Sequence, residues 1–268
     1  MSAQLILGKE RTLYLGPLAS PLSLSLAASR LLVALEQPLW IRAGHERQAI
    51  ACRTALLPVG GRFQVDSGRQ PVADFHLNVT GTDLERLSQA ARAGNSGHWF
   101  AHLSSETALV AECRRLHASA PPPDAVAATL ANLVEIGAPH LPPVGTPDPR
   151  ILATIEHIRL TVTGNPSLTE LAQRAGLSRS RLANLFKSQV GVPIRRYRLW
   201  HRLFVACTHM ARGTSVTEAA LNSGFSDAAH LSHTFREILD IAPSDLFGPS
   251  AQLNVVVEPM VSLATDMA

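Results

Sequence analysis

The feature that most restricts how this chain can fold is a short sequence that occurs twice. Residues 167–178 read SLTELAQRAGLS and residues 215–226 read SVTEAALNSGFS, with six of the twelve aligned positions identical. A Ser followed three residues later by Glu forms a capping box at the start of a helix. The Gly at the tenth position suits the left-handed turn that ends a short helix. Each copy therefore predicts a short helix, a tight turn and the start of a second helix.

The second helix of each copy has an apolar side and a polar side. Apolar residues at 182, 185 and 186, and at 231, 235 and 238, are expected to pack inward. Two short helices joined by a tight turn form a helix-turn-helix, whose second helix enters the major groove of DNA. An ordinary helical hairpin is the alternative, and two copies in register argue against it. In the first copy the residues expected to face DNA are Arg179, Ser180, Arg181, Ala183, Asn184 and Lys187. In the second copy they are Ala228, Ala229, His230, Ser232, His233 and Arg236.

Residues 193–212 are predicted to form one long helix between the two copies. Pro193 suits a first helical position and Gly213 a helix end. A helix over 194–212 would be about 28 Å long at ~1.5 Å per residue, and major grooves on one face of DNA recur every ~34–36 Å. The helix would therefore hold two helix-turn-helix units at adjacent grooves. We expect phosphate contacts from Arg195 and Arg196, with an exposed surface role left open, and from the helix-capping Ser178 and Ser226.

The charge of the chain is concentrated in the same region. Residues 150–248 hold 12 Lys and Arg against 7 Asp and Glu, a net charge of +5, whereas residues 1–149 hold 12 of each. A basic segment beside a neutral one indicates a polyanionic partner. A merely solvated surface remains the alternative on charge alone.

The first 136 residues predict a β-rich domain with trailing helices. Short apolar runs with turns between them reach residue 79, and LSLSLA at 22–27 alternates as a half-buried strand does. Helical spacing follows, and the apolar stripe of the helix at 124–136 suits either a core or a dimer surface. Five prolines in residues 139–149 place a linker at 137–149. The fold class is therefore α+β: domain 1–136, linker 137–149, helical domain 150–248, and a tail at 249–268 that is either loose or a strand docking back.

Several function classes lack support. There is no stretch of 18 apolar residues and no signal-peptide pattern, so we expect a cytoplasmic protein without a membrane partner. The three cysteines, Cys52, Cys113 and Cys207, are far apart, and buried inert thiols are favoured over oxidant sensors. His98 and His102 have the spacing of a metal pair on a helix, but no third ligand is near. We predict no metal, no cofactor and no catalytic residue.

Residues 150–247 resemble the DNA-binding domain of the AraC/XylS family of bacterial transcription regulators. The resemblance covers the opening helix ILATIEHIRL, both helix-turn-helix units, the linking helix, and the segment GFSDAAHLSHTFREIL, which runs into IAPSDLF. Asp240 stands where the family usually has Gly, and Gly248 where it usually has Arg. The resemblance implies that Asn184 contacts a base edge, with adenine preferred, and that Lys187 and Arg236 lie near the DNA backbone. Promoter DNA and RNA polymerase are the implied partners.

The family often joins this domain to a cupin-like β-barrel that senses a ligand and to dimerising helices. Residues 1–136 suit that layout, so a small-molecule effector and a homodimer through the helix at 124–136 are expected. One alternative is a regulator of the same fold with no small effector. Another is a cupin-type enzyme with a helical appendage, but His45, Glu46 and His76 do not form the His-x-His, Glu and His pattern of a metal-dependent cupin.

Overall fold

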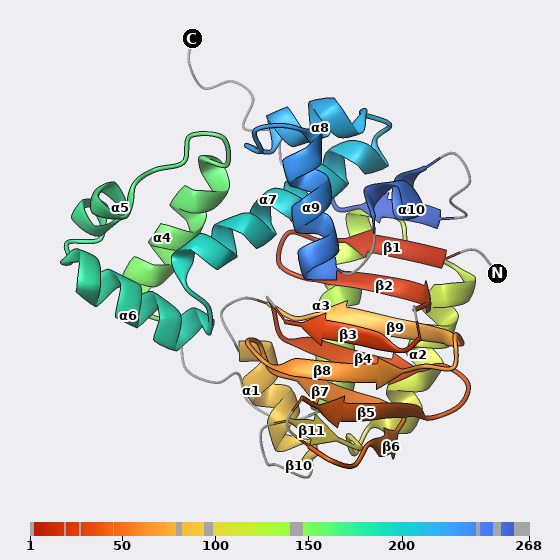
Figure 1. The fold of residues 1–268 in the computed structure, drawn as a ribbon. Helices are drawn as coiled ribbons and strands as arrows, with labels where there is room; N and C mark the ends of the chain where they lie inside the picture. Colours follow the sequence, from red (N-terminus) through yellow and green to blue (C-terminus); the bar gives the residue numbers. More distant parts are fainter. Residues whose placement is uncertain are drawn as a thin grey trace.

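The computed structural model describes residues 3–18, 20–26, 28–44, 46–78, 82–93, 99–139, 147–239, 242–248 and 253–259. The first part of the chain forms a β-rich body with three helices, and the second part forms a helical domain (Figure 1). This confirms the predicted α+β class. Of the helices described, none combines the length and the apolar character that crossing a bilayer requires.

Two sheets build the β-rich body. The larger has the strand order β10-β11-β7-β4-β9-β2-β1-β12, and the smaller has the order β3-β8-β5-β6. The described pairings are antiparallel, apart from the parallel pairing of β1 with β12. The strands of the larger sheet are β1 Ala3–Leu7, β2 Thr12–Pro17, β4 Arg30–Ala34, β7 Thr54–Leu57, β9 Pro71–His76, β10 Arg92–Ala93, β11 Phe100–Ala101 and β12 Leu253–Val257. Those of the smaller sheet are β3 Leu22–Ser25, β5 Leu39–Ala43, β6 Ile50–Cys52 and β8 Arg62–Asp66.

The alternation of side chains along the strands explains how the layers pack. On the smaller sheet, Leu22 and Leu24 of β3 are buried and Ser23 is exposed, as the LSLSLA pattern predicted. Every residue of β4 is buried, because the larger sheet is covered on both faces. One face meets the smaller sheet in a core that includes Leu32 and Trp99. The opposite face meets the helices.

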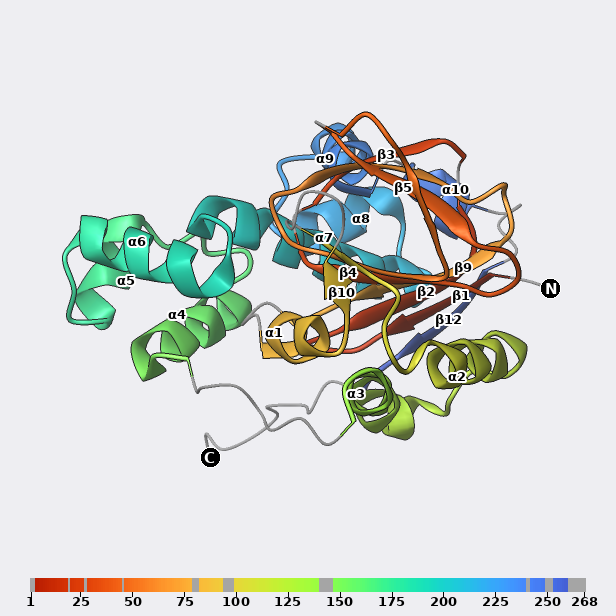
Figure 2. The ribbon, with the colours of Figure 1, turned by 90° about the horizontal axis from the view of Figure 1, so that it is seen from below.

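Three helices, α1 Thr82–Gln89, α2 Glu106–Ala118 and α3 Val126–Gly137, form that outer layer (Figure 2). The apolar stripe of α3 packs there: Val126, Leu130, Leu133 and Val134 are at most 1% exposed. The stripe is therefore core, and the alternative that these four side chains form a dimer surface is wrong. A dimer through the exposed face of α3 stays a prediction.

The helical domain consists of two units at opposite ends of one long helix (Figure 1). Its helices are α4 Pro149–Leu160, α5 Leu168–Arg174, α6 Arg179–Val190, α7 Ile194–Ala211, α8 Val216–Asn222, α9 Ala228–Leu239 and α10 Pro243–Phe247. Helix α7 has 18 residues and is thus about 27 Å long at ~1.5 Å per residue. It buries Tyr197, Trp200, Leu203 and Met210 along its length. Between α3 and α4, residues 140–146 of the predicted proline-rich linker lie outside the described residues.

The unit of α8 and α9 lies closer to the β-rich body than the unit of α4, α5 and α6 does (Figures 1 and 2). The first unit meets the body where Gly191, at the end of α6, approaches the side chain of Val59. Helix α9 contacts β3 and α7 contacts β12. Leu5 and Leu7 of β1 belong to the same core cluster as Trp200 and Leu203 of α7.

The chain returns to the first sheet after the helical domain. Strand β12 pairs in parallel with β1, with Leu253 opposite Ala3 and Val257 opposite Leu7. The side chain of Glu258 accepts a hydrogen bond from the backbone N–H of Lys9 at 2.9 Å and forms an ion pair with its ammonium at 3.4 Å. Of the two forms left open for the tail, residues 253–257 adopt the docked strand.

Candidate nucleic-acid interface and interdomain pocket

The first helix-turn-helix has the local structure that its sequence predicts. The side chain of Ser167 accepts from the backbone N–H of Glu170 at 3.1 Å, and the carboxylate of Glu170 accepts from the backbone N–H of Ser167, which completes the capping box. Gly176 has φ +63°, the left-handed conformation that ends α5. The hydroxyl of Ser178 then accepts from the backbone N–H of Arg181 and caps α6.

The second unit repeats this design with one difference. Ser215 and Glu218 form the same capping box, and Gly224 has φ +79°. The predicted cap of the next helix, Ser226, is wrong: the carboxylate of Asp227 accepts from the backbone N–H of His230 at 2.7 Å. The hydroxyl of Ser226 instead donates to Asp227 at 3.0 Å. Asp is as good an N-cap as Ser because both offer an oxygen at the same reach.

The second helix of each unit presents its polar side to solvent. In α6, Leu182 and Phe186 are fully buried, and in α9 Leu231 and Phe235 are fully buried. The predicted DNA-facing residues that are exposed are Arg179, Ser180, Arg181, Asn184, Lys187, Ala229, His230, His233 and Arg236. The half-buried ones are Ala183, Ala228 and Ser232. The polar sides of α6 and α9 are therefore open to solvent, as contact with DNA requires.

The arginines of α7 divide into two groups. Arg195 is exposed and Arg196 is half-buried, so the surface position that their predicted role needs is present for both. Arg198 donates to the carbonyl oxygen of Pro166, and Arg202 donates to that of Val162 at 3.3 Å. These two side chains hold the connection between α4 and α5 against α7. Their structural role could not be read from the sequence, because their partners are backbone carbonyls more than 30 residues away.

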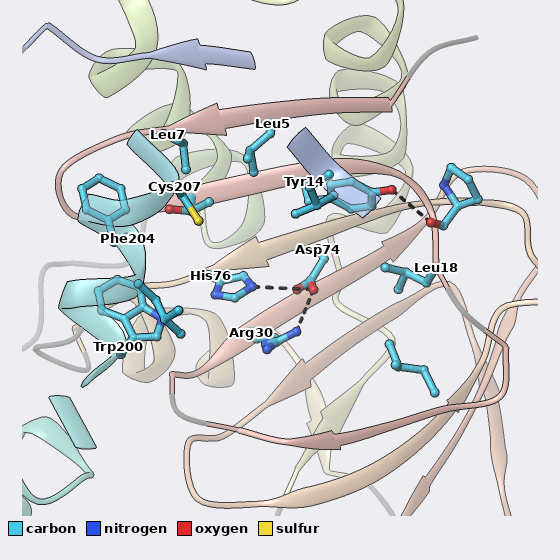
Figure 3. A pocket seen from close by; sticks show the side chains of 15 residues that line it. Leu5, Leu7, Tyr14, Leu18, Arg30, Asp74, His76, Trp200, Phe204 and Cys207 are labelled. Carbon is cyan, nitrogen blue, oxygen red and sulfur yellow. Dashed lines mark hydrogen bonds and ion pairs between the residues drawn. The ribbon is translucent and has the colours of Figure 1, made fainter. Parts of the chain in front are cut away.

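A pocket of about 290 Å³ lies between the larger sheet and α7 (Figure 3). Its walls are apolar: β1 supplies Leu5 and Leu7, and α7 supplies Trp200, Leu203, Phe204 and Cys207. Its polar residues come from three neighbouring strands and share one face of the sheet, since side chains two residues apart point the same way. They are Thr12 and Tyr14 of β2, Arg30 of β4, and Asp74 and His76 of β9.

The polar residues are held together by an ion pair. Arg30 donates to the Oδ2 of Asp74 at 2.8 Å, and the Nε2 of His76 lies 3.6 Å from the same oxygen. Burial opposes ionisation of Asp74, but the charge of Arg30 and the contact with His76 outweigh it and lower the pKa of Asp74 to about 2. Burial, followed by the charge of Arg30, lowers the pKa of His76 below its usual 6.5. At neutral pH Asp74 is therefore ionised and His76 is neutral.

No local sequence pattern indicates this pocket. The short apolar runs that reach residue 79 predict strands in this region, and His76 is a candidate only for the metal pattern of a cupin. The available signal was that Asp74 and His76 stand two residues apart in an otherwise apolar strand, which places two titratable groups on one face. Their partner Arg30 and the wall from α7 are distant in sequence, so no local pattern indicated them.

The remaining candidate groups are inert or outside the described residues. Burial raises the pKa of Cys52, Cys113 and Cys207 to about 12, so these thiols are protonated and fit the predicted inert role. Within the described residues, no cluster of three or more His, Cys, Asp or Glu side chains could hold a metal ion. His45 and His98 of the two metal patterns, and Asp240, lie outside that part of the chain.

Comparison with known proteins finds a matching family model and solved structures of similar fold. Residues 171–248 match the family model of a helix-turn-helix domain. No curated protein matches the sequence. The crystal structure of ToxT from Vibrio cholerae is similar over 90% of this chain and 98% of that one, with a TM-score of 0.58 at 12% identity. ToxT with a bound unsaturated fatty acid is similar over 90% and 96%, with a TM-score of 0.56 at 11% identity. An AraC-type regulator from Chromobacterium violaceum is 28% identical over 36% of this chain and 88% of that one, with a TM-score of 0.35.

Proposed function

Because the chain belongs to the AraC/XylS family of bacterial transcription regulators, we propose that it binds promoter DNA through both helix-turn-helix units and responds to a small effector. The site of action is the cytoplasm, where promoter DNA and RNA polymerase are found. The effector acts from the pocket between the sheet and α7. Regulation without a small effector is the competing proposal.

The observation that carries the proposal is the pair of exposed helices at the two ends of α7. The 18 residues of α7 separate the units by about 27 Å, and successive major grooves lie ~34–36 Å apart on one face of the duplex. The helices add their own width to that separation, so α6 and α9 can enter neighbouring grooves.

The two units contribute differently to DNA binding. Helix α6 carries three exposed cations, Arg179, Arg181 and Lys187. Helix α9 carries Arg236, and the exposed carboxylate of Asp227 caps its beginning. Phosphate contacts supply affinity that falls with salt, whereas base-edge contacts supply specificity. The first unit is therefore the main electrostatic anchor, and the second unit adds mainly through the side chains of residues 228–233.

Within α6, Asn184 is the proposed base-reading residue. Its side chain is exposed, one turn beyond the start of the helix, where recognition helices approach base edges. Its amide matches the N6 and N7 edge of adenine. Lys187, Arg195 and Arg196 are proposed phosphate contacts, together with Ser178 at the start of α6. Ser226 remains a proposed phosphate contact, but its hydroxyl already donates to Asp227.

The effector site is proposed from the position of the pocket. One wall belongs to β1 and the other to α7, the helix that carries both DNA-binding units. A ligand that fills the pocket changes the free energy of the arrangement in which α7 and α9 lie against the sheet. It thereby changes the population of chains whose units are free to bind adjacent grooves. That one ToxT structure holds an unsaturated fatty acid supports an apolar effector.

Footprinting tests the DNA-binding proposal. The full-length chain should protect two stretches of a selected promoter fragment, one helical turn apart on the same face, and its affinity should fall steeply with salt. Arg179→Ala combined with Lys187→Ala should reduce the salt slope by about 2, while Arg62→Ala, an exposed cation of β8, should leave it unchanged. A single protected stretch would contradict the use of both units.

A further inference from the structure

Resting on the effector pocket proposed above, we propose that its ligand is a neutral, largely apolar molecule with an O–H or N–H hydrogen-bond donor, and that the Arg30–Asp74 ion pair selects against carboxylates. The apolar walls of the pocket would accept many apolar ligands. The polar residues that form its floor, Thr12, Tyr14, Arg30, Asp74 and His76, determine which head group of the ligand is accepted.

The charge of the floor is already balanced. Among the lining residues that the structure describes, Arg30 is the cation and Asp74 the anion at neutral pH, and their side chains are 3% and 7% exposed. His76 adds no positive charge there, because its pKa is lowered. A carboxylate that enters would lose its hydration and would face Asp74 as well as Arg30. Burying an ion without its own countercharge is unfavourable.

The floor retains capacity to accept hydrogen bonds. A carboxylate offers about four acceptor sites, and the contacts of Asp74 with Arg30 and His76 go to Oδ2. The Oδ1 of Asp74 is buried and has no hydrogen-bond partner within the described part of the chain. The hydroxyl of Tyr14 donates to the carbonyl oxygen of Pro17 at 3.0 Å, which leaves its lone pairs free to accept. A ligand donor therefore finds acceptors in this floor, whereas a ligand carboxylate finds a fixed negative charge.

The dimensions of the site set a limit on the ligand. A volume of about 290 Å³ is just below the usual range for ligand pockets, ~300–1,000 Å³. Trp200 and Phe204 of α7 stack with their rings 6.2 Å apart and close one side. The class that fits is a medium-length aliphatic alcohol or an alkyl-substituted phenol or amide.

The test compares two probes that differ only in the head group, 1-decanol and decanoate, by calorimetric titration of the full-length chain at pH 7.5. We expect 1-decanol to bind the wild-type chain at least ~10-fold more tightly, about 1.4 kcal/mol. Asp74→Asn removes the negative charge of Asp74 from the pocket and keeps that of Arg30, and the preference should reverse in favour of decanoate. Asp83→Asn is the matched control, because Asp83 is a buried carboxylate paired with Arg11 outside the pocket.

Tighter binding of decanoate to the wild-type chain overturns the inference and leaves the effector pocket standing. The same holds if Asp74→Asn and Asp83→Asn keep the same preference. Should Asp74→Asn fail to fold, the ratio of the two probes on the wild-type chain still decides. If neither probe binds, both the inference and the effector pocket fail, while the footprint on promoter DNA tests the DNA-binding proposal separately.

Discussion

Gly224 lies against the carbonyl oxygen of Val162, so that a Cβ added at Gly224 would be 2.7 Å from that oxygen and 3.1 Å from the Nε of Arg202. Val162 follows α4 in the first unit, and Gly224 ends α8 in the second. The turn of the second helix-turn-helix is therefore packed against a chain segment of the first. Gly176, the equivalent turn residue of the first unit, has open space around the same position.

This difference predicts unequal effects of the same substitution. Gly176→Ala should cost about 1–2 kcal/mol of the free energy of unfolding, the price of a left-handed conformation in a residue with a Cβ. Gly224→Ala should cost more, about 3–4 kcal/mol, because the methyl group also displaces the carbonyl of Val162 and the side chain of Arg202. Urea unfolding of both variants measures the difference. Equal losses would show that backbone conformation alone matters at these turns.

The exposed polar side of α6 predicts separate effects on specificity and affinity. Asn184→Ala should lose about 1–3 kcal/mol of discrimination at one base pair. Lys187→Ala should weaken binding to all sequences alike and reduce the salt slope by about 1. Asn222→Ala is the control, because Asn222 is an equally exposed Asn on α8, the first helix of its unit. Binding to a panel of single-base variants measures both quantities. If Asn184→Ala weakens every sequence equally, Asn184 does not read a base.

The cap of α9 predicts a gain of affinity. Asp227 is exposed at the end of α9 that is proposed to approach DNA, and its negative charge repels phosphate. Asp227→Asn keeps an N-cap oxygen and removes the charge, so DNA binding at low salt should tighten a few-fold for all sequences. Glu112→Gln on α2, far from the helical domain, should have no effect. An unchanged affinity in Asp227→Asn would place this carboxylate away from the DNA backbone.

Histidine at the centre of α7 predicts a loss of stability in mild acid. Burial, followed by the charge of Arg159, lowers the pKa of His201 to about 4. The unfolded chain takes up the proton near pH 6.5 and the native chain only near pH 4, so stability is lost as the pH falls between these values. Between pH 7 and pH 5 His201 alone contributes about 2 kcal/mol to this loss. His201→Phe, which keeps a ring between Tyr197 and Phe204, should remove that contribution and leave the one from His76, whose pKa burial also lowers. His209→Phe, a half-exposed control on the same helix, should not.

The sequence predicted the parts of this fold that depend on local order. The capping box at Ser167 and the left-handed turn at Gly176 involve residues within one turn of each other, so their pattern is visible in the chain. The docking of β12 on β1 is not, because it joins residues 250 positions apart and only the β-branched run at 255–257 indicates a strand. The pocket was missed for the same reason, since Asp74 and the wall from Trp200 meet only in the folded chain.

Strand β12 packs on both sides of the larger sheet. Its residues Leu253, Val255 and Val257 pack on the core shared with α7, and Val256 packs on the opposite core under α3. Ending the chain at residue 248 removes these contacts and leaves the edge of β1 without its parallel partner. The free energy of unfolding should then fall by about 2–5 kcal/mol, since buried aliphatic side chains contribute about 1.5–3 kcal/mol each when burial is complete and these are only partly buried. Ending the chain at residue 259 keeps β12 and Glu258 in place and is the matched control, which should be the more stable of the two shortened chains. Thermal unfolding of the two shortened chains distinguishes these outcomes. If both chains melt together, β12 contributes nothing to holding the helical domain on the sheet.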